Sequence, residues 1–185
     1  VAGRMIKKRL QRMFTAREIR LERDLKRHAD FADKPRKKIL IAGSSGLIGR
    51  QLVAFLDTGG HDVWRLVRRK AKKDEKELVW KPEVGIINHD ELEGFDAIIH
   101  LGGAGIGDKR WSKKRMKLIE ESRTKSTALL ANAIKQLNKK PEAFIVASAV
   151  GWYGERGDDE LDESSTPGEG FLPDTCARWE ESCQA

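Results

Sequence analysis

The chain has 185 residues, of which 39% are hydrophobic and 35% are charged, and its formal net charge is +7. This length corresponds to roughly one domain, and the hydrophobic content is enough for a core, so the composition excludes a wholly disordered chain. No apolar run approaches the roughly 18 residues that a membrane-spanning helix needs, which excludes a membrane span on sequence grounds.

The first 37 residues are predicted to form a basic helical arm followed by a linker. Thr15 followed by Glu18 has the form of a capping box, which predicts a break near Phe14 and a second helix over about residues 16–28. A single amphipathic arm cannot bury its apolar stripe, and the sequence begins in the middle of this pattern without Met. We therefore expect residues 1–37 to be the end of an upstream domain. The stripe consists of Ile6, Leu10, Met13, Phe14, Leu21 and Leu25.

The basic charge of the chain is concentrated in this arm. Residues 1–38 hold fourteen Lys or Arg and five Asp or Glu, whereas residues 151–185 hold two basic and ten acidic residues. The globular body therefore carries no basic surplus, which disfavours nucleic acid as its partner. Contact of the arm with nucleic acid or an acidic membrane stays open as an alternative to a solvated helix face.

From Lys38 onward the pattern alternates between short apolar runs and amphipathic segments. The near-continuous apolar runs are typical of strands buried on both faces of a parallel sheet. We therefore predict a Rossmann-like, doubly wound parallel sheet with helices on both faces, over residues 38–185. Strands are expected at 38–43, 62–67, 77–82, 94–103 and 142–150, and helices at 47–60 and 111–138.

An acidic, glycine-rich loop follows the last expected strand, and Pro173 is expected to open the final helix as its first residue. On that helix Cys176 and Cys183 would lie about 10 Å apart, too far for a disulfide with each other. Two free thiols are typical of a reducing compartment, so we expect a cytoplasmic location.

A glycine-rich turn between the first strand and the first helix of this domain is the strongest motif. The first glycine permits a sharp turn, the second lets the backbone approach a pyrophosphate, and the third lets helix and strand pack closely. The free N–H groups of the helix N-terminus then favour phosphate. The flanking strand and helix supply the context that a dinucleotide site requires. The predicted contacts are Gly43, Ser44, Ser45, Gly46, Leu47, Ile48 and Gly49.

The end of the second strand indicates which dinucleotide the site prefers. An NAD site usually places Asp or Glu there, whereas a 2′-phosphate calls for arginine. This chain has Arg68 and Arg69, followed by Lys70, and no acidic residue before Asp74. The sequence therefore favours NADP(H) over NAD(H), with a solvated basic turn as the alternative.

The segment "HLGGAG" lies at the carboxyl end of the strand expected over 94–103, where ligands bind in such sheets. Its small residues would let the backbone lie against the cofactor. His100, just before it, is expected to be a packed strand residue and not a base. The predicted cofactor contacts in this segment are Leu101, Gly102, Gly103 and Ala104.

Several further motifs carry a family resemblance from about Lys38 to the end of the chain. "GSSGLIG", "AIIHLGGAGIGDKRW", "ESRTKST", "ASAVGWYGERGDDELDES" and "GEGF…CARWEE" together resemble an epimerase-like family of atypical short-chain dehydrogenases/reductases. The resemblance implies a Rossmann fold, a dinucleotide cofactor and a small-molecule substrate that the sequence does not identify. Some bacterial members are fused behind a START-like domain, and the helical arm is similar to that junction. The family continues with a substrate-binding portion, which we expect this chain to lack.

The wider superfamily uses a hydroxyl residue, a Tyr-x-x-x-Lys pair and often an Asn on the long helix. By the resemblance, the Tyr and Lys positions fall on Leu172 and Cys176, and the Asn position falls on Arg123. Arg123 is therefore included among the cofactor contacts. The hydroxyl position falls on Ala149, one residue from Ser148. The chain's single tyrosine is Tyr153.

Ser148 and Tyr153 are thus the two catalytic candidates, and the usual Tyr and Lys are missing. One hypothesis is an NADP(H)-binding oxidoreductase of unknown substrate whose chemistry uses other residues. The other is a non-catalytic protein that binds NADP(H) as a structural or sensing ligand, with an upstream fused domain as partner.

Overall fold

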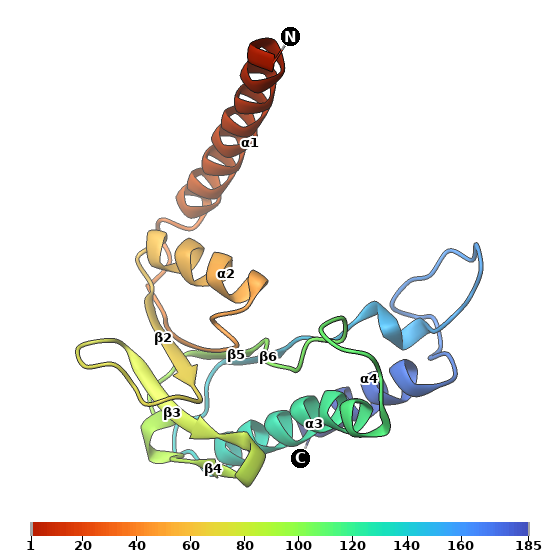
Figure 1. Ribbon diagram of the computed structural model, residues 1–185. Coiled ribbons are helices and arrows are strands. Elements are labelled where there is room, and N and C mark those ends of the chain that lie inside the picture. The colour runs from red at the N-terminus through yellow and green to blue at the C-terminus, as the bar shows by residue number, and fades with distance from the viewer. Residues whose placement is uncertain (1, 185) are drawn as a thin grey trace.

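A computed structural model describes residues 2–184 of the chain, which form a six-stranded sheet with helices on both faces (Figure 1). The strand order is β4-β3-β2-β1-β5-β6, and every pair of neighbours is parallel except β3 and β4. The predicted Rossmann-like sheet is confirmed, with a short antiparallel strand added. The strands are β1 (Lys38–Ala42), β2 (Asp62–Val67), β3 (Glu77–Lys81), β4 (Ile86–Ile87), β5 (Ala97–His100) and β6 (Ala143–Val146).

The helices divide between the two faces of the sheet. The second helix covers one face, and the third and fourth lie together on the other (Figure 1). The α-helices are α1 (Ala2–Asp30), α2 (Leu47–Thr58), α3 (Lys113–Lys135) and α4 (Phe171–Glu181). Short 3-10 helices occupy Pro82–Val84, Asp90–Leu92, Val150–Tyr153 and Ser182–Gln184.

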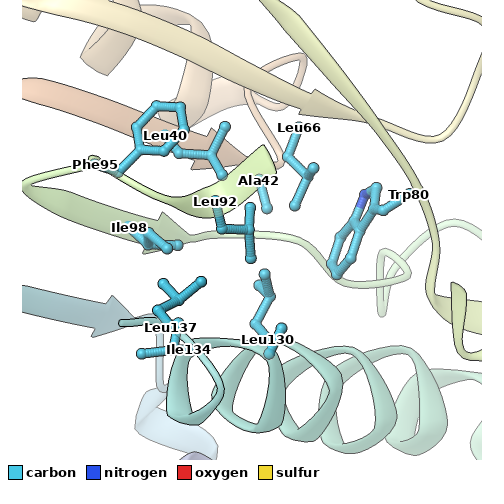
Figure 2. Close-up of a cluster of buried hydrophobic side chains, with 11 residues drawn as sticks. Leu40, Ala42, Leu66, Trp80, Leu92, Phe95, Ile98, Leu130, Ile134 and Leu137 are labelled. Carbon is cyan, nitrogen blue, oxygen red and sulfur yellow. The ribbon is translucent and has the colours of Figure 1, made fainter. Parts of the chain in front are cut away.

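The central strand β1 explains why the core has two halves. Alternate side chains of a strand point to opposite faces. Leu40 and Ala42 therefore enter the cluster beneath α3, where Figure 2 shows them across from Leu130 and Ile134. Ile41 enters the smaller cluster beneath α2. A strand buried on both faces must be apolar at every position, and this is the pattern that the sequence shows.

The α1 helix differs from its prediction. It is continuous from Ala2 to Asp30, so the predicted break near Phe14 is wrong. A capping box stabilises a helix start only where the backbone leaves helical geometry, and here Thr15 and Glu18 lie inside an uninterrupted helix. The helix projects away from the sheet (Figure 1), and its apolar side chains are exposed. Near its end, His28 stacks on Phe55 of α2 at 4.3 Å between ring centroids.

Two further expectations about the C-terminal third are corrected. The last α-helix begins at Phe171, so Pro173 is its third residue and not its first. Proline is tolerated there because the first four N–H groups of a helix have no partner within it. The strand predicted over 142–150 covers only residues 143–146, and it is not buried on both faces. Phe144 packs toward the α3 side, whereas Ile145 is 51% exposed because β6 is the edge strand.

Within residues 2–184, no helix is both long enough and apolar enough to cross a membrane.

Candidate functional site

The turn from β1 into α2 requires glycine at two of its three positions. Gly43 has φ +85°, and a Cβ there would lie 2.7 Å from the backbone of Leu101 and Gly102. A Cβ on Gly49 would collide with the carbonyl oxygen of Gly43 and lie 2.8 Å from Ser44 Cα. The turn closes with a 3.0 Å hydrogen bond from the Gly46 N–H to the Gly43 carbonyl. The fingerprint therefore brings β1, α2 and the end of β5 into close contact.

A cleft of about 1010 Å³ opens beside this turn, along the carboxyl ends of β2, β1 and β5. This is the edge of a parallel sheet at which such folds bind their ligands. Most of the predicted cofactor contacts line it, from three separate stretches of the chain. These are Gly43, Ser44, Ser45, Gly46, Arg68, Arg69, Leu101, Gly102, Gly103 and Ala104.

Four predicted contacts do not line the cleft. Leu47 and Ile48 point to solvent, with 77% and 68% of their surface exposed. Gly49 is buried beneath the turn. Arg123 lies behind the loop that follows β5 and not in the cleft itself. A role of these four in direct cofactor contact stays a prediction.

The basic segment after β2 is organised by a residue that the sequence analysis missed. Glu77, whose side chain is 1% exposed, accepts hydrogen bonds from both terminal nitrogens of Arg69, at 2.8 and 2.5 Å. It also accepts the backbone N–H of Lys72 at 2.9 Å. The Arg69 guanidinium and this backbone bond lower the pKa of Glu77 to about 2. Arg68 and Arg69 are both exposed, but Arg69 is held in an ion pair, whereas Arg68 has no carboxylate partner among residues 2–184.

The α3 helix holds the loop after β5 in place. The Ala104 N–H donates to Ser122 Oγ at 2.9 Å, and the Arg123 guanidinium donates to the Ala104 carbonyl at 3.0 Å. Arg123 also lies 5.1 Å from the ring centre of Trp179 on α4, and its burial lowers its pKa. Arg123 therefore links α3, α4 and the loop that forms one wall of the cleft.

His100 is a packed strand residue, as predicted. It is fully buried, and its Nε2 lies 2.8 Å from Ser126 Oγ on α3. Its Nδ1 accepts a 3.3 Å hydrogen bond from the Gly102 N–H. Burial lowers the pKa of His100 to about 4, so the ring is neutral at pH 7. A neutral ring with both nitrogens engaged supports the wall of the cleft.

The two catalytic candidates lie outside the residues that line the cleft. The Ser148 hydroxyl donates a hydrogen bond to Glu180 of α4. The Tyr153 hydroxyl donates to the Asp162 carbonyl at 2.9 Å, within the acidic loop. The structure therefore engages both hydroxyls locally and does not bring them together with the glycine turn.

The α4 positions that correspond to the Tyr and Lys of the superfamily have a packing role. Cys176 is 4% exposed, and its Sγ lies 3.7 Å from the Ala149 carbonyl. Burial raises the pKa of this thiol, which disfavours the thiolate. An added Cβ on Gly151 would lie 3.3 Å from Leu172 Cβ and 3.6 Å from Cys176 Sγ. These side chains therefore seat α4 against the segment after β6.

Comparison with known proteins gives a consistent result. The model of the NAD dependent epimerase/dehydratase family matches residues 39–174. An epimerase family protein of Mycobacterium leprae is 41% identical over 81% of this chain and 48% of its own length. The chain spans about half the length of the curated relatives that it matches.

Two solved structures are similar in fold. The nucleoside-diphosphate sugar epimerase from Corynebacterium glutamicum matches with a TM-score of 0.78 and 36% identity, over 92% of this chain and 36% of that one. The human epimerase family protein SDR39U1, solved with NADPH, matches with a TM-score of 0.69 and 28% identity, over 78% of this chain and 48% of that one.

Proposed function

The chain belongs to the NAD dependent epimerase/dehydratase family, in its atypical short-chain dehydrogenase/reductase branch, and from that premise we propose that it binds NADP(H) as an epimerase-like oxidoreductase. The observation that carries the proposal is the composition of the cleft. A glycine turn at a helix N-terminus faces the cleft, and the exposed Arg68 stands at the end of β2, where NAD sites place a carboxylate.

The residues present fit the cofactor. A Cβ added at Gly46 would lie in the turn, 3.3 Å from the Gly43 carbonyl oxygen. Glycine therefore leaves this turn free of side-chain atoms where a pyrophosphate would approach the backbone. The N–H groups at the start of α2 would face the phosphates. The backbone of Gly102 and Gly103 would lie along the rest of the molecule. When bound, the cofactor supplies or accepts a hydride.

The chain's own residues leave the acid–base step without its usual partners. A Tyr-x-x-x-Lys pair would have to come from α4, where Leu172 and Cys176 stand instead. Tyr153 and Ser148 are the candidates for proton transfer, and each would have to give up its present hydrogen bond to reach a substrate. Their engagement favours a second candidate function, in which NADP(H) is bound as a structural or sensing ligand without turnover.

The arm is part of the proposal. We assign residues 1–37 to the end of an upstream domain of START-like type, and residues 38–185 to the cofactor-binding domain. The match to the Corynebacterium glutamicum structure covers 92% of the chain, which is more than residues 38–185 alone supply, so part of the arm has a counterpart in that structure. The match to the human structure covers 78%.

Cofactor choice is tested by charge reversal. Arg68→Glu should weaken NADPH binding and improve NADH relative to it, because a carboxylate accepts ribose hydroxyls and repels a 2′-phosphate. The measurement is a fluorescence titration of each nucleotide at fixed salt. Equal affinities of the unaltered chain for the two nucleotides would exclude the NADP(H) preference.

Turnover separates the enzyme from the ligand-binding protein. The assay follows NADPH oxidation and hydride exchange against a panel of carbonyl compounds and nucleotide sugars. Activity that Tyr153→Phe abolishes while NADPH affinity is retained would support catalysis through Tyr153 and exclude the sensing function. Tight NADPH binding without oxidation or exchange against the whole panel would exclude the enzyme.

A further inference from the structure

Six cationic side chains line the cleft, and four of them are already paired with carboxylates. Their partners come from the same cleft wall, at distances of 2.5–3.2 Å. The paired cations are Arg65 and Lys72 with Glu75, Arg69 with Glu77, and Lys125 with Glu121. Arg50 and Arg68 are the other two, and within residues 2–184 neither guanidinium has a carboxylate partner.

The fold places these two arginines on adjacent elements at the same edge of the sheet. Ala42 at the end of β1 pairs with Leu66 of β2, so the turn after β1 lies beside the segment that begins at Arg68. The N–H of Arg50 donates to the Gly46 carbonyl at 3.1 Å, which puts Arg50 one turn into α2. Both residues line the cleft beside the glycine turn.

Pairing decides which cations can bind an added phosphate. Arg69 would have to leave Glu77, a carboxylate with a 1% exposed side chain, and an unpaired buried charge is strongly unfavourable. Arg50 and Arg68 are exposed and give up no such partner. Two guanidinium groups from different elements can donate to different oxygens of one phosphate, and such charge-assisted bonds are the strong ones.

We propose that Arg50 is a specificity-determining residue for the cofactor, and that it binds the 2′-phosphate of NADP(H) together with Arg68. Arg69 is a positioning residue, which holds the segment after β2 through Glu77. This assignment rests on the proposed function. It also narrows the expectation drawn from the sequence, in which Arg68 and Arg69 shared the phosphate and Arg50 had no role.

The negative groups of the cleft are compatible with this assignment. Three of the lining carboxylates, those of Glu75, Glu77 and Glu121, face cations at 3.2 Å or less. Asp57 lies two turns further along α2 than Arg50. Glu83 lines the cleft from the 3-10 helix after β3. Arg50 is thus closer to the glycine turn in the chain than any of these carboxylates.

The test compares two pairs of ligands that differ only in a 2′-phosphate: NADPH against NADH, and adenosine 2′,5′-bisphosphate against adenosine 5′-monophosphate. Isothermal titration calorimetry on the unaltered chain and on Arg50→Gln supplies the four affinities. We expect Arg50→Gln to weaken the binding of NADPH and of adenosine 2′,5′-bisphosphate about tenfold, and to leave the affinities for NADH and adenosine 5′-monophosphate within about twofold. Arg50→Lys should recover part of the loss, since it restores the charge without the planar fork.

The control is Arg65→Gln, which removes one paired cation of the same cleft, as Arg50→Gln removes one unpaired cation, and leaves the carboxylate of Glu75 paired with Lys72. It should leave both affinity ratios unchanged. If Arg50→Gln weakened the affinity for all four ligands equally, or for none of them, the role of Arg50 would be overturned. The proposed function would still stand in that case, provided that the unaltered chain preferred NADPH to NADH. A chain that did not distinguish NADPH from NADH would instead fail the proposed function.

Discussion

The glycine turn makes a quantitative prediction for Gly49→Ala. The added Cβ would meet only backbone atoms: the Gly43 carbonyl oxygen, Ser44 Cα at 2.8 Å and the Gly43 carbonyl carbon at 2.9 Å. Ordinary van der Waals contact begins at 3.4 Å. Because none of these atoms belongs to a flexible side chain, α2 and the turn must separate by about half an ångström or more.

The size of the effect follows from two opposing terms. Overpacking of this kind costs about 1–3 kcal/mol. Replacing glycine by alanine in a helix gains up to about 1 kcal/mol. We therefore expect a net loss of about 1–2 kcal/mol, which in a chain of this size lowers the thermal midpoint by about 2–8 °C. Separation of the turn should also weaken NADPH binding.

Gly46→Ala is the matched control. Gly46 has φ −71° and caps α2, and its added Cβ would lie 3.3 Å from the Gly43 carbonyl oxygen. We expect this variant to lose NADPH affinity but to lower the thermal midpoint less than Gly49→Ala does, because its cost is limited to a poorer N-cap residue and one slightly tight contact. Thermal unfolding and NADPH titration of both variants supply the comparison. A Gly49→Ala variant as stable as Gly46→Ala would refute the packing argument.

Three further predictions concern the core and the buried charges. Leu130→Ala should lower the free energy of unfolding, measured by urea denaturation, by about 2–5 kcal/mol, because Leu130 is fully buried beneath the sheet. Leu129 is only partly buried, so Leu129→Ala should lower it less, and equal losses would contradict the assigned core. The free energy of unfolding should fall by about 3 kcal/mol as pH falls from 6.5 to about 4, because the folded protein resists protonation of His100, and a His100→Gln variant that kept the full pH dependence would refute this. Glu77→Gln should lower the thermal midpoint at pH 7 because it weakens the contact with Arg69. The difference in thermal midpoint between the variant and the unaltered chain should shrink as pH falls below 4.5, because the carboxylate of Glu77 then loses its contribution to stability, down to its folded pKa of about 2. A deficit that did not change with pH would mean that the charge of Glu77 is not what matters.

The sheet could be predicted because its signals are local. Leu40 and Ile41 follow one another on a strand with both faces covered, so the strand is apolar throughout. Gly49 is fixed by backbone contacts with Gly43 and Ser44 in the same turn, and the φ of +85° at Gly43 is a property of that turn. Where the signal depends on what lies above a strand, prediction failed: Ile145 belongs to an apolar run like the others, yet it is exposed at the sheet edge.

The helix ends and the electrostatics of the cleft were beyond a reading of local sequence. Thr15 and Glu18 have the spacing of a capping box, but continuous helix on both sides overrides it. The pairing of Arg69 with Glu77 depends on how residues 68–76 fold back between β2 and β3. Nothing in the sequence distinguishes Arg69 from Arg68. The one feature of the sequence that could have indicated this ion pair is Glu77, an acidic residue at the start of an apolar strand.

The cleft beside the glycine turn is proposed to select a 2′-phosphorylated dinucleotide. The decisive measurement is the ratio of NADPH to NADH dissociation constants for the unaltered chain, at one salt concentration, by direct titration. Arg50 and Arg68 together predict NADPH binding at least about tenfold tighter than NADH. Equal binding, or tighter binding of NADH, would contradict the account.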